Sequence, residues 1–251
     1  MIMFYFSGTG NSKYIAELFC RHTGAGCRSI EEEADFTRLI SPETTVCFCY
    51  PVYGSRVPRV MREFAERHMA ALKGKELMIF CTQMVFSGDG ARAFYGLFPR
   101  GSVTVRYAEH FLMPNNVCNL FFLPLAGEKS TERYLKNAGI KMEKICAEIQ
   151  RGTIRKRGFN PVSRALGAVQ GVFMPGLERR ALNKVWIDGS CDGCGRCVTS
   201  CPMKNLKRGD GGITTDNNCT MCYRCINLCP KKAISVFVRG KIKRQYKGVT
   251  K

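Results

Sequence analysis

Short hydrophobic runs alternate with longer amphipathic stretches along the first 150 residues. The runs are continuous and too short for helices, which is typical of buried strands, and they lie at residues 1–6, 46–50, 77–81 and 103–105. Between them, apolar residues recur at helical spacing after Lys13 and over 59–71 and 129–150. Strands that alternate with helices in this way predict an α/β fold, a doubly wound parallel sheet with helices on both faces.

Residues 151–186 form a basic, partly helical linker. Arg151, Arg155, Lys156 and Arg157 begin it. Apolar residues then recur at helical spacing, at Val162, Ala165, Leu166, Val169, Val172 and Phe173. A basic amphipathic helix can lie on an anionic membrane surface. We favour the alternative, in which the apolar stripe packs on its own protein across a domain junction.

Eight of the fifteen cysteines stand in two runs of identical spacing, Cys-x2-Cys-x2-Cys-x3-Cys-Pro. This is the spacing of bacterial two-cluster ferredoxins. Three closely spaced thiolates wrap one iron–sulfur cube, and the fourth cysteine, before a proline, points away to the other cube. Residues 187–251 are therefore expected to be a small α+β ferredoxin-like domain with two [4Fe–4S] clusters and a basic C-terminal tail. The expected ligands are Cys191, Cys194, Cys197 and Cys229 for one cluster, and Cys219, Cys222, Cys225 and Cys201 for the other.

Zinc knuckles are the alternative explanation of these runs. Zinc sites commonly use two pairs of ligands separated by a longer gap, not four cysteines in eleven residues repeated twice. The other seven cysteines are scattered singly, and we interpret them as small buried hydrophobic side chains. They are Cys20, Cys27, Cys47, Cys49, Cys81, Cys118 and Cys146.

The first strand stops at a loop of small residues, Ser7-Gly8-Thr9-Gly10-Asn11-Ser12, and a helix follows. Backbone amides, hydroxyls and the helix dipole at such a turn favour a phosphate group. The loop lacks the Gly-Lys-Ser/Thr ending of a Walker loop and the three-glycine spacing of a dinucleotide fingerprint. A glycine turn without a ligand remains the alternative.

This loop resembles the FMN phosphate loop of flavodoxins, and the layout of residues 1–150 resembles the same family. The resemblance implies a flavodoxin-like FMN-binding domain in which Ser7, Thr9, Gly10, Asn11 and Ser12 hold the phosphate. The loops at 51–55 and 82–90 would flank the isoalloxazine ring, although the second lacks the tyrosine-rich pattern of free-standing flavodoxins. The ring contacts expected there are Pro51, Val52, Tyr53, Gly54, Thr82, Gln83 and Gly88. Tyr53 is the candidate to stack on the ring; otherwise it packs on its own domain.

The whole chain resembles a family of flavodoxin–ferredoxin fusion proteins found mainly in anaerobic bacteria and archaea. Met113-Pro114-Asn115 after the fifth strand also resembles this family. The resemblance implies electron transfer by a flavo-iron-sulfur protein. So many free thiols are a further reason to expect an anaerobe.

The net charge of +19 is unevenly placed. Lys and Arg number 14 against 12 acidic residues in 1–130, but 25 against 8 in 131–251. A basic face can attract acidic protein carriers, nucleic acid or an anionic membrane. Because the basic residues form no recognisable reading helix, nucleic acid is disfavoured. No run of residues approaches a membrane span, and the N-terminus is unlike a signal peptide, so the expected compartment is the cytoplasm.

Three functions follow from these features. The favoured one is a relay that couples two-electron chemistry at FMN to one-electron carriers such as ferredoxin or flavodoxin through the clusters. The alternative is an oxidoreductase: an FMN-dependent reductase of a small organic substrate, such as a quinone or an unsaturated acid, that is fed through the clusters. A nucleic-acid-binding redox sensor is the third. The three histidines, His22, His68 and His110, are separated and interpreted as structural or exposed, so no catalytic residues are assigned.

Overall fold

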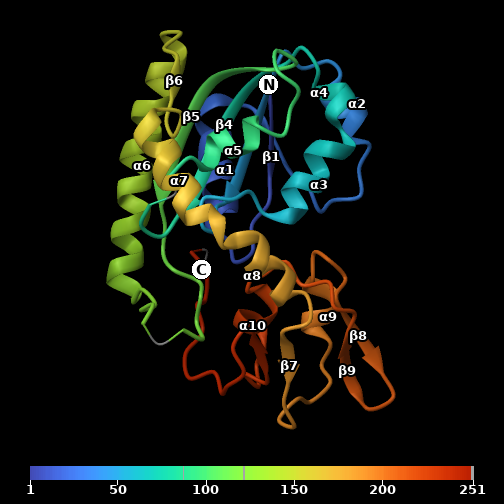
Figure 1. Ribbon diagram of the computed structural model, residues 1–251. Helices are drawn as coiled ribbons and strands as arrows, with labels where there is room; N and C mark the ends of the chain where they lie inside the picture. The colour runs from blue at the N-terminus through green and yellow to red at the C-terminus, as the bar shows by residue number, and fades with distance from the viewer. Residues whose placement is uncertain (87, 121, 250–251) are drawn as a thin grey trace.

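A six-stranded parallel sheet forms the centre of the N-terminal part (Figure 1). The computed structural model describes residues 1–86, 88–120 and 122–249. The strands are β1 (Ile2–Tyr5), β2 (Gly26–Ser29), β3 (Thr45–Pro51), β4 (Glu76–Gln83), β5 (Thr104–Leu112) and β6 (Arg155–Lys156). Their order, β2-β1-β3-β4-β5-β6, is the flavodoxin-like order with β6 added at the edge. The predicted doubly wound fold is confirmed.

Helices cover both faces of this sheet, which explains why its strands are apolar on both sides. Phe4 and Phe48 pack under one helical layer, whereas their neighbours Met3 and Cys47 pack under the other. The first layer contains α2 (Phe36–Ile40), α3 (Arg59–Arg67), α4 (Met69–Leu72) and α5 (Gly90–Tyr95). The second contains α1 (Asn11–Thr23) and α6 (Glu128–Gln150).

Most of the scattered cysteines belong to these cores. Cys47, Cys49 and Cys81 are fully buried on the central strands, and Cys20 and Cys146 are buried under the helices. This confirms their interpretation as small apolar side chains. Cys27 and Cys118 are half-buried.

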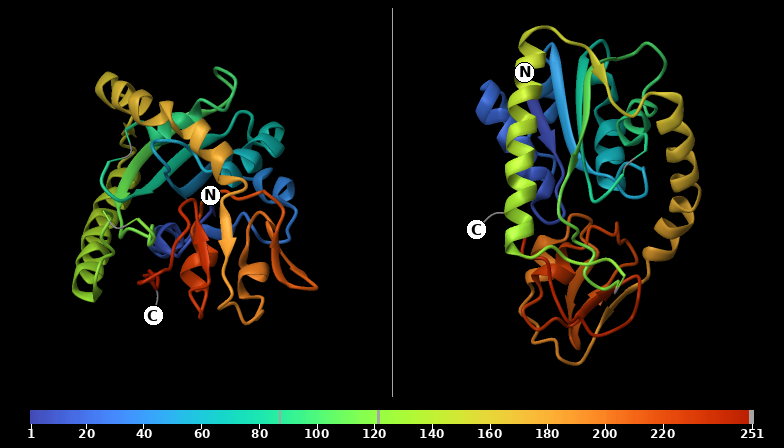
Figure 2. Two further views of the ribbon diagram at one scale, coloured as in Figure 1. Left: turned by 60° about the horizontal axis from the view of Figure 1, so that its bottom comes forward. Right: turned by 90° about the vertical axis from the view of Figure 1, so that its left-hand side faces the viewer.

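Two helices, α7 (Pro161–Val172) and α8 (Met174–Ala181), connect the sheet to the C-terminal part. In Figure 2 (right), α7 descends on the side opposite α6. It packs through its glycines: a Cβ at Gly167 would collide with the Asp89 carboxylate, and one at Gly171 with the Arg56 guanidinium. The expected packing of the apolar stripe is therefore wrong. Glycines allow the close approach, and the apolar residues are left on the opposite, exposed side of the helix.

The C-terminal part is built from two short antiparallel sheets and two short helices. Strand β7 (Val185–Ile187) pairs with β10 (Ile234–Val236), and β8 (Leu206–Gly209) pairs with β9 (Gly212–Thr215). The helices, α9 (Arg196–Ser200) and α10 (Arg224–Leu228), each begin one residue before the third cysteine of a run. The two cysteine runs are thus a structural as well as a sequence repeat.

After β10 the chain returns to the N-terminal part. Tyr246 and Val249 are buried there, in the core under α1 and α6, whereas Ile242 packs in the core of the C-terminal part. Figure 1 places this last segment at the junction of the two parts. Among the residues described, no helix is both long enough and apolar enough to cross a bilayer.

Candidate functional site

A cavity of about 320 Å³ opens at the carboxyl ends of β1, β3, β4 and β5, where doubly wound sheets bind their ligands. Both parts of the chain line it. Ten of the twelve residues expected to contact FMN lie on its wall: Ser7, Thr9, Asn11, Ser12, Pro51, Val52, Tyr53, Gly54, Thr82 and Gln83. Three loops that are distant in sequence are thus brought to one place.

The other two expected contacts, Gly10 and Gly88, do not line this cavity. Gly10 precedes α1 with φ 100°, a left-handed conformation that glycine adopts without strain. Gly88 lies beneath α7, where an added Cβ would stand 2.7 Å from the Cα of Gly167. Gly10 therefore allows the turn into α1, and Gly88 allows the close approach of α7. Residue 87 of the same expected loop lies outside the described residues.

The loop between β1 and α1 has the features of a phosphate cradle. The Gly10 amide donates to Ser7 Oγ over 3.1 Å, and Ser12 and Thr82 share a buried hydroxyl hydrogen bond of 2.7 Å. The first turn of α1 contains no acidic residue, so nothing opposes the positive end of the helix dipole. The hydroxyls and amides present fit the phosphate of FMN.

Beyond the cradle the cavity wall is apolar, as a flat flavin ring requires. Met84, Met113 and Leu123 line it from the N-terminal part, and Met174 and Leu177 from α8. Tyr53 is half-buried and its hydroxyl is fully buried, with no hydrogen-bond partner among the described residues. Burial holds the pKa of Tyr53 well above its ordinary value, so the phenol stays protonated.

Three cysteines of the second run line a small cavity, together with Cys201 of the first run. These are the four residues expected to share a cluster: Cys201, Cys219, Cys222 and Cys225. Backbone amides donate to the sulfurs, from Asn205 to Cys201 at 3.3 Å and from Met221 to Cys219 at 3.4 Å. Such amides stabilise the negative charge of thiolate-bound iron. The thiol-only donor set fits an iron–sulfur cluster.

Of the remaining four ligands expected from the sequence, Cys197 and Cys229 are buried. Cys194 is exposed and Cys191 is half-buried, and the charges of Cys191, Cys194 and Cys229 all act on Cys197. Within the described part of the chain, no group of three such side chains is close enough to hold a single metal ion. A cube with iron at its corners holds its thiolates farther apart than one ion does, so this observation does not oppose a cluster.

One side chain, Tyr223, lines both the large cavity and the cage around Cys222. It is 8% exposed and adopts φ 58°, whereas Gly195 holds the equivalent left-handed position in the first repeat. A bulky residue in this conformation is strained, by about 1–3 kcal/mol, and such strain is concentrated at functional sites. Tyr223 is thus the residue that the two cavities share.

Arg224, the next residue, ties the cluster loops to the phosphate loop. Its guanidinium donates to the carbonyl of Ser7 at 2.7 Å and to that of Gly8 at 3.1 Å. It also donates to the carbonyl of Ser200 at 2.8 Å and pairs with Glu31 at 2.6 Å. This one side chain thus contacts both cysteine repeats and the phosphate loop.

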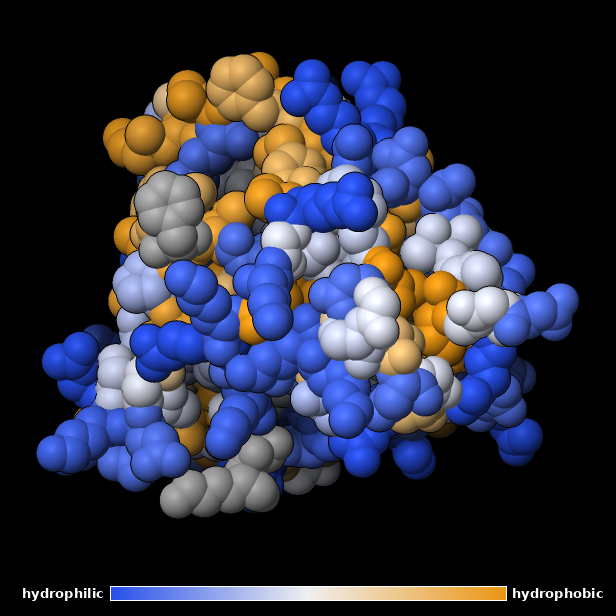
Figure 3. Space-filling view, turned by 90° about the horizontal axis from the view of Figure 1, so that it is seen from below, coloured by the Kyte–Doolittle hydropathy of each residue, from blue (hydrophilic) through white to orange (hydrophobic). Residues whose placement is uncertain are grey.

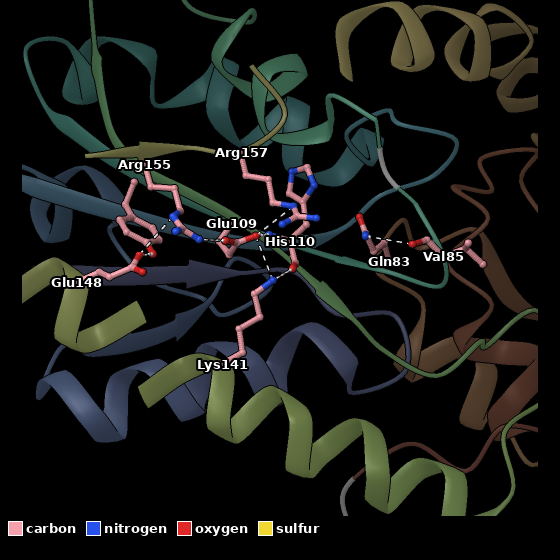
Figure 4. A network of polar contacts seen from close by, with 9 residues as sticks. Gln83, Val85, Glu109, His110, Lys141, Glu148, Arg155 and Arg157 are labelled. Carbon is pink, nitrogen blue, oxygen red and sulfur yellow. Dashed lines mark hydrogen bonds and ion pairs between the residues drawn. The ribbon is translucent and has the colours of Figure 1, made fainter. Parts of the chain in front are cut away.

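A polar network fixes the start of the linker to the sheet (Figure 4). The carboxylate of Glu109, 1% exposed, is surrounded by Lys141 at 3.1 Å, Arg155 at 3.1 Å and Arg157 at 3.3 Å. Burial raises the pKa of Glu109, but the His110 amide and these cations outweigh it and hold the pKa below its ordinary value. Burial also lowers the pKa of His110 to about 4. The basic start of the linker is therefore partly a structural anchor.

Sequence reasoning missed the residues that the C-terminal part contributes to the large cavity. They are Met221, Tyr223 and Phe237, with Met174 and Leu177 from α8. The Met113-Pro114-Asn115 segment was noticed, and it lines the cavity beside the phosphate loop. For Met221 and Tyr223 the one available signal was that these bulky residues stand in the second cysteine run where Gly193 and Gly195 stand in the first.

Comparison with known proteins agrees with this arrangement. The Flavodoxin domain family matches residues 2–153, and the 4Fe-4S dicluster domain family matches residues 190–234. The first match covers more than half of the chain. No curated protein matches the chain.

Solved structures that resemble the chain match a little over half of it. A flavodoxin from the domain Archaea is 14% identical, with a TM-score of 0.36 over 57% of this chain and 96% of that one. Megasphaera elsdenii flavodoxin is 17% identical, with a TM-score of 0.37 over 56% and 99%. The Trp repressor binding protein of Bacillus subtilis is 12% identical, with a TM-score of 0.41 over 55% and 96%. At these TM-scores the likenesses add nothing to the family match.

Proposed function

The chain belongs to the flavodoxin family and carries a 4Fe-4S dicluster domain behind its flavodoxin domain, and on this basis we propose that it relays electrons between FMN and two [4Fe–4S] clusters. Both domain families are typical of electron transfer, and their combination in one chain is that of a flavo-iron-sulfur protein. FMN supplies the exchange of a two-electron reaction for one-electron steps, and the chain's own residues position the partners.

The observation that carries the proposal is the position of Tyr223. Its side chain lines the cavity that fits FMN and also the cage of Cys201, Cys219, Cys222 and Cys225. One side chain therefore spans the separation between the two sites. Apolar side chains from α8 and from the loop after β5 line the rest of the cavity, which favours an apolar ring there.

The cluster expected at Cys191, Cys194, Cys197 and Cys229 would exchange electrons with external carriers. Its expected ligand Cys194 is exposed, and Arg196, Arg208 and Lys231 lie exposed around the first cysteine run. Positive charge at this surface favours the reduced, more negative cluster and attracts acidic carriers in a salt-dependent way. Small acidic ferredoxins or flavodoxins are thus the proposed partners.

An anaerobic reductive titration of iron-reconstituted protein tests the relay. Flavin absorbance and cluster EPR are followed together, while iron and FMN are counted. About eight irons and one FMN per chain, reduced in a coupled sequence, would support the relay. Eight irons with no bound FMN would reject it and leave the N-terminal part as a docking module for another protein.

A second cavity favours one alternative, an FMN-dependent reductase of a small organic substrate. It measures about 330 Å³ and adjoins the flavin cavity, sharing Val52, Gly54 and Gln83 with it. Its wall is largely apolar, with the amide of Gln170 from α7. Chemically reduced protein offered quinones and unsaturated acids would separate the two functions, because only a reductase reoxidises its flavin with a substrate faster than with a ferredoxin.

A further inference from the structure

The apolar face of α7 points away from the protein. Val162, Leu166, Val169 and Phe173 recur every three or four residues, so they share one side of the helix. They are 68%, 45%, 66% and 71% exposed, whereas Gly167 and Gly171 on the opposite side are buried. A helix of this kind normally has its apolar side on the protein, and here the orientation is reversed.

Two residues of a neighbouring loop extend this surface. Val85 and Phe86 are 69% and 43% exposed and line the second cavity together with Gln170 of α7. Seen from below in Figure 3, hydrophobic side chains gather along the upper left edge, where Figure 2 (left) places α7. We call Val162, Leu166, Val169 and Phe173, with Val85 and Phe86, the α7 face. Exposed apolar side chains that gather in one place, next to charged ones, are typical of interaction sites on soluble domains.

The charges around the α7 face are positive. No acidic residue occurs in 149–177, and Arg179 and Arg180 on α8, which follows α7 directly, are exposed. The two nearest carboxylates are already paired, Asp89 with Arg92 at 2.6 Å and Glu178 with Arg62 at 2.8 Å. These two carboxylates therefore do not neutralise Arg179 or Arg180.

We propose that the α7 face docks the protein on an anionic lipid bilayer. Aliphatic and phenylalanine side chains enter the boundary between headgroups and acyl chains, and the flanking arginines contact anionic headgroups. A second copy of the chain fits this surface poorly, because it would bring the same arginines into opposition. The attachment is peripheral, and it places the mouth of the second cavity, between Phe86 and Gln170, at the lipid surface.

Vesicle sedimentation with the holoprotein tests this docking. Vesicles of phosphatidylcholine alone are compared with vesicles containing one quarter phosphatidylglycerol, at low salt and at 0.5 M salt. We expect binding to the anionic vesicles, weakening with salt because screening shortens the reach of the arginine charges. Val169→Glu should reduce this binding about tenfold. It removes one apolar side chain that would enter the lipid and adds a negative charge that the anionic headgroups repel.

Ile140→Glu on α6 is the matched control, because Ile140 is 58% exposed and lies on another helix. It should bind as the unchanged protein does, and iron and FMN contents should be equal in all variants. Absence of binding to anionic vesicles would overturn the proposal, as would an equal loss in Ile140→Glu. A dimer, or a complex with an acidic ferredoxin, that Val169→Glu abolishes without any vesicle binding would also overturn it and assign the α7 face to a protein.

Discussion

The carbonyl oxygen of Cys222 lies directly against Gly8, so that the phosphate loop and a cluster-ligand loop touch through their backbones. A Cβ added at Gly8 would collide with this oxygen and stand 3.4 Å from the Cβ of Cys222. Glycine is required here because it has no side chain to hold the loops apart. The contact explains how two regions more than 200 residues apart in sequence form one site.

Gly8→Ala should therefore separate the two loops. Overpacking of this kind costs about 1–3 kcal/mol. We expect weaker FMN binding and slower exchange between flavin and clusters, measured by fluorescence titration and by anaerobic rapid mixing. Gly139→Ala on α6 is the control, since an added Cβ there meets nothing within 4 Å. Unchanged FMN affinity and exchange rate in Gly8→Ala would show that the contact has no functional role.

The end of the chain supports the phosphate loop from outside the cavity. The Tyr246 hydroxyl donates to Asn11 Oδ1 at 2.7 Å, while its backbone amide donates to Asn227 Oδ1 at 2.7 Å. Tyr246→Phe removes the first bond, and a hydrogen bond of this kind contributes about 0.5–1.5 kcal/mol. FMN affinity should fall about two- to tenfold, with iron content unchanged. Tyr95→Phe on α5 should leave FMN affinity unchanged; an equal fall there would contradict the role of Tyr246.

Arg224 should stabilise the junction of the two parts. Arg224→Met removes its bonds to Ser7 and Gly8 and leaves the carboxylate of Glu31 without its partner. Breaking such a partly buried pair costs about 3 kcal/mol, which lowers the melting temperature by roughly 6–12 °C in a chain of this size. Arg28→Met, which breaks an exposed pair with Glu32, should change it by less than about 2 °C. Calorimetry under anaerobic conditions compares the two variants.

His110 should make stability depend on pH. Its pKa is about 4 in the folded protein because it is buried, against about 6.5 in an unfolded chain. Between these values the unfolded state binds the additional proton, so stability falls as the pH is lowered from about 6.5. From pH 7.5 to pH 5 this loss is about 2 kcal/mol. His110→Asn should reduce it, which thermal unfolding at both pH values measures. Any effect of pH on the clusters is the same in both proteins. A stability that depends on pH equally in the unchanged protein and in His110→Asn would therefore contradict a buried neutral His110.

The sheet and the loops at the ends of its strands were predictable because each depends on local sequence. Apolar runs identify β1, β3 and β4, and the turn at Ser7–Ser12 must follow β1 wherever the strand ends. The side on which helix α7 of the linker packs was not predictable. Its apolar stripe is typical of a packed helix, and nothing local shows that Gly167 and Gly171 make the closer contact with Asp89 and Arg56.

That Tyr223 lines both cavities could not be predicted from the sequence either. Tyr223 lies within a cysteine run, where spacing predicts ligands but not which neighbours face the flavin cavity. That orientation depends on how the two parts meet, through Gly8 and Arg224. Contacts between residues so far apart in sequence leave no periodic pattern.

The rate of electron exchange within a single chain tests the relay most directly. Holoprotein is reduced at its clusters by a flash-generated one-electron donor under anaerobic conditions, and flavin absorbance is followed at several protein concentrations. We expect the flavin to be reduced at one rate that does not depend on protein concentration, because Tyr223 lines both sites and the transfer takes place within one chain. A rate that rises in proportion to protein concentration, or a flavin that stays oxidised while the clusters are reduced, would contradict it.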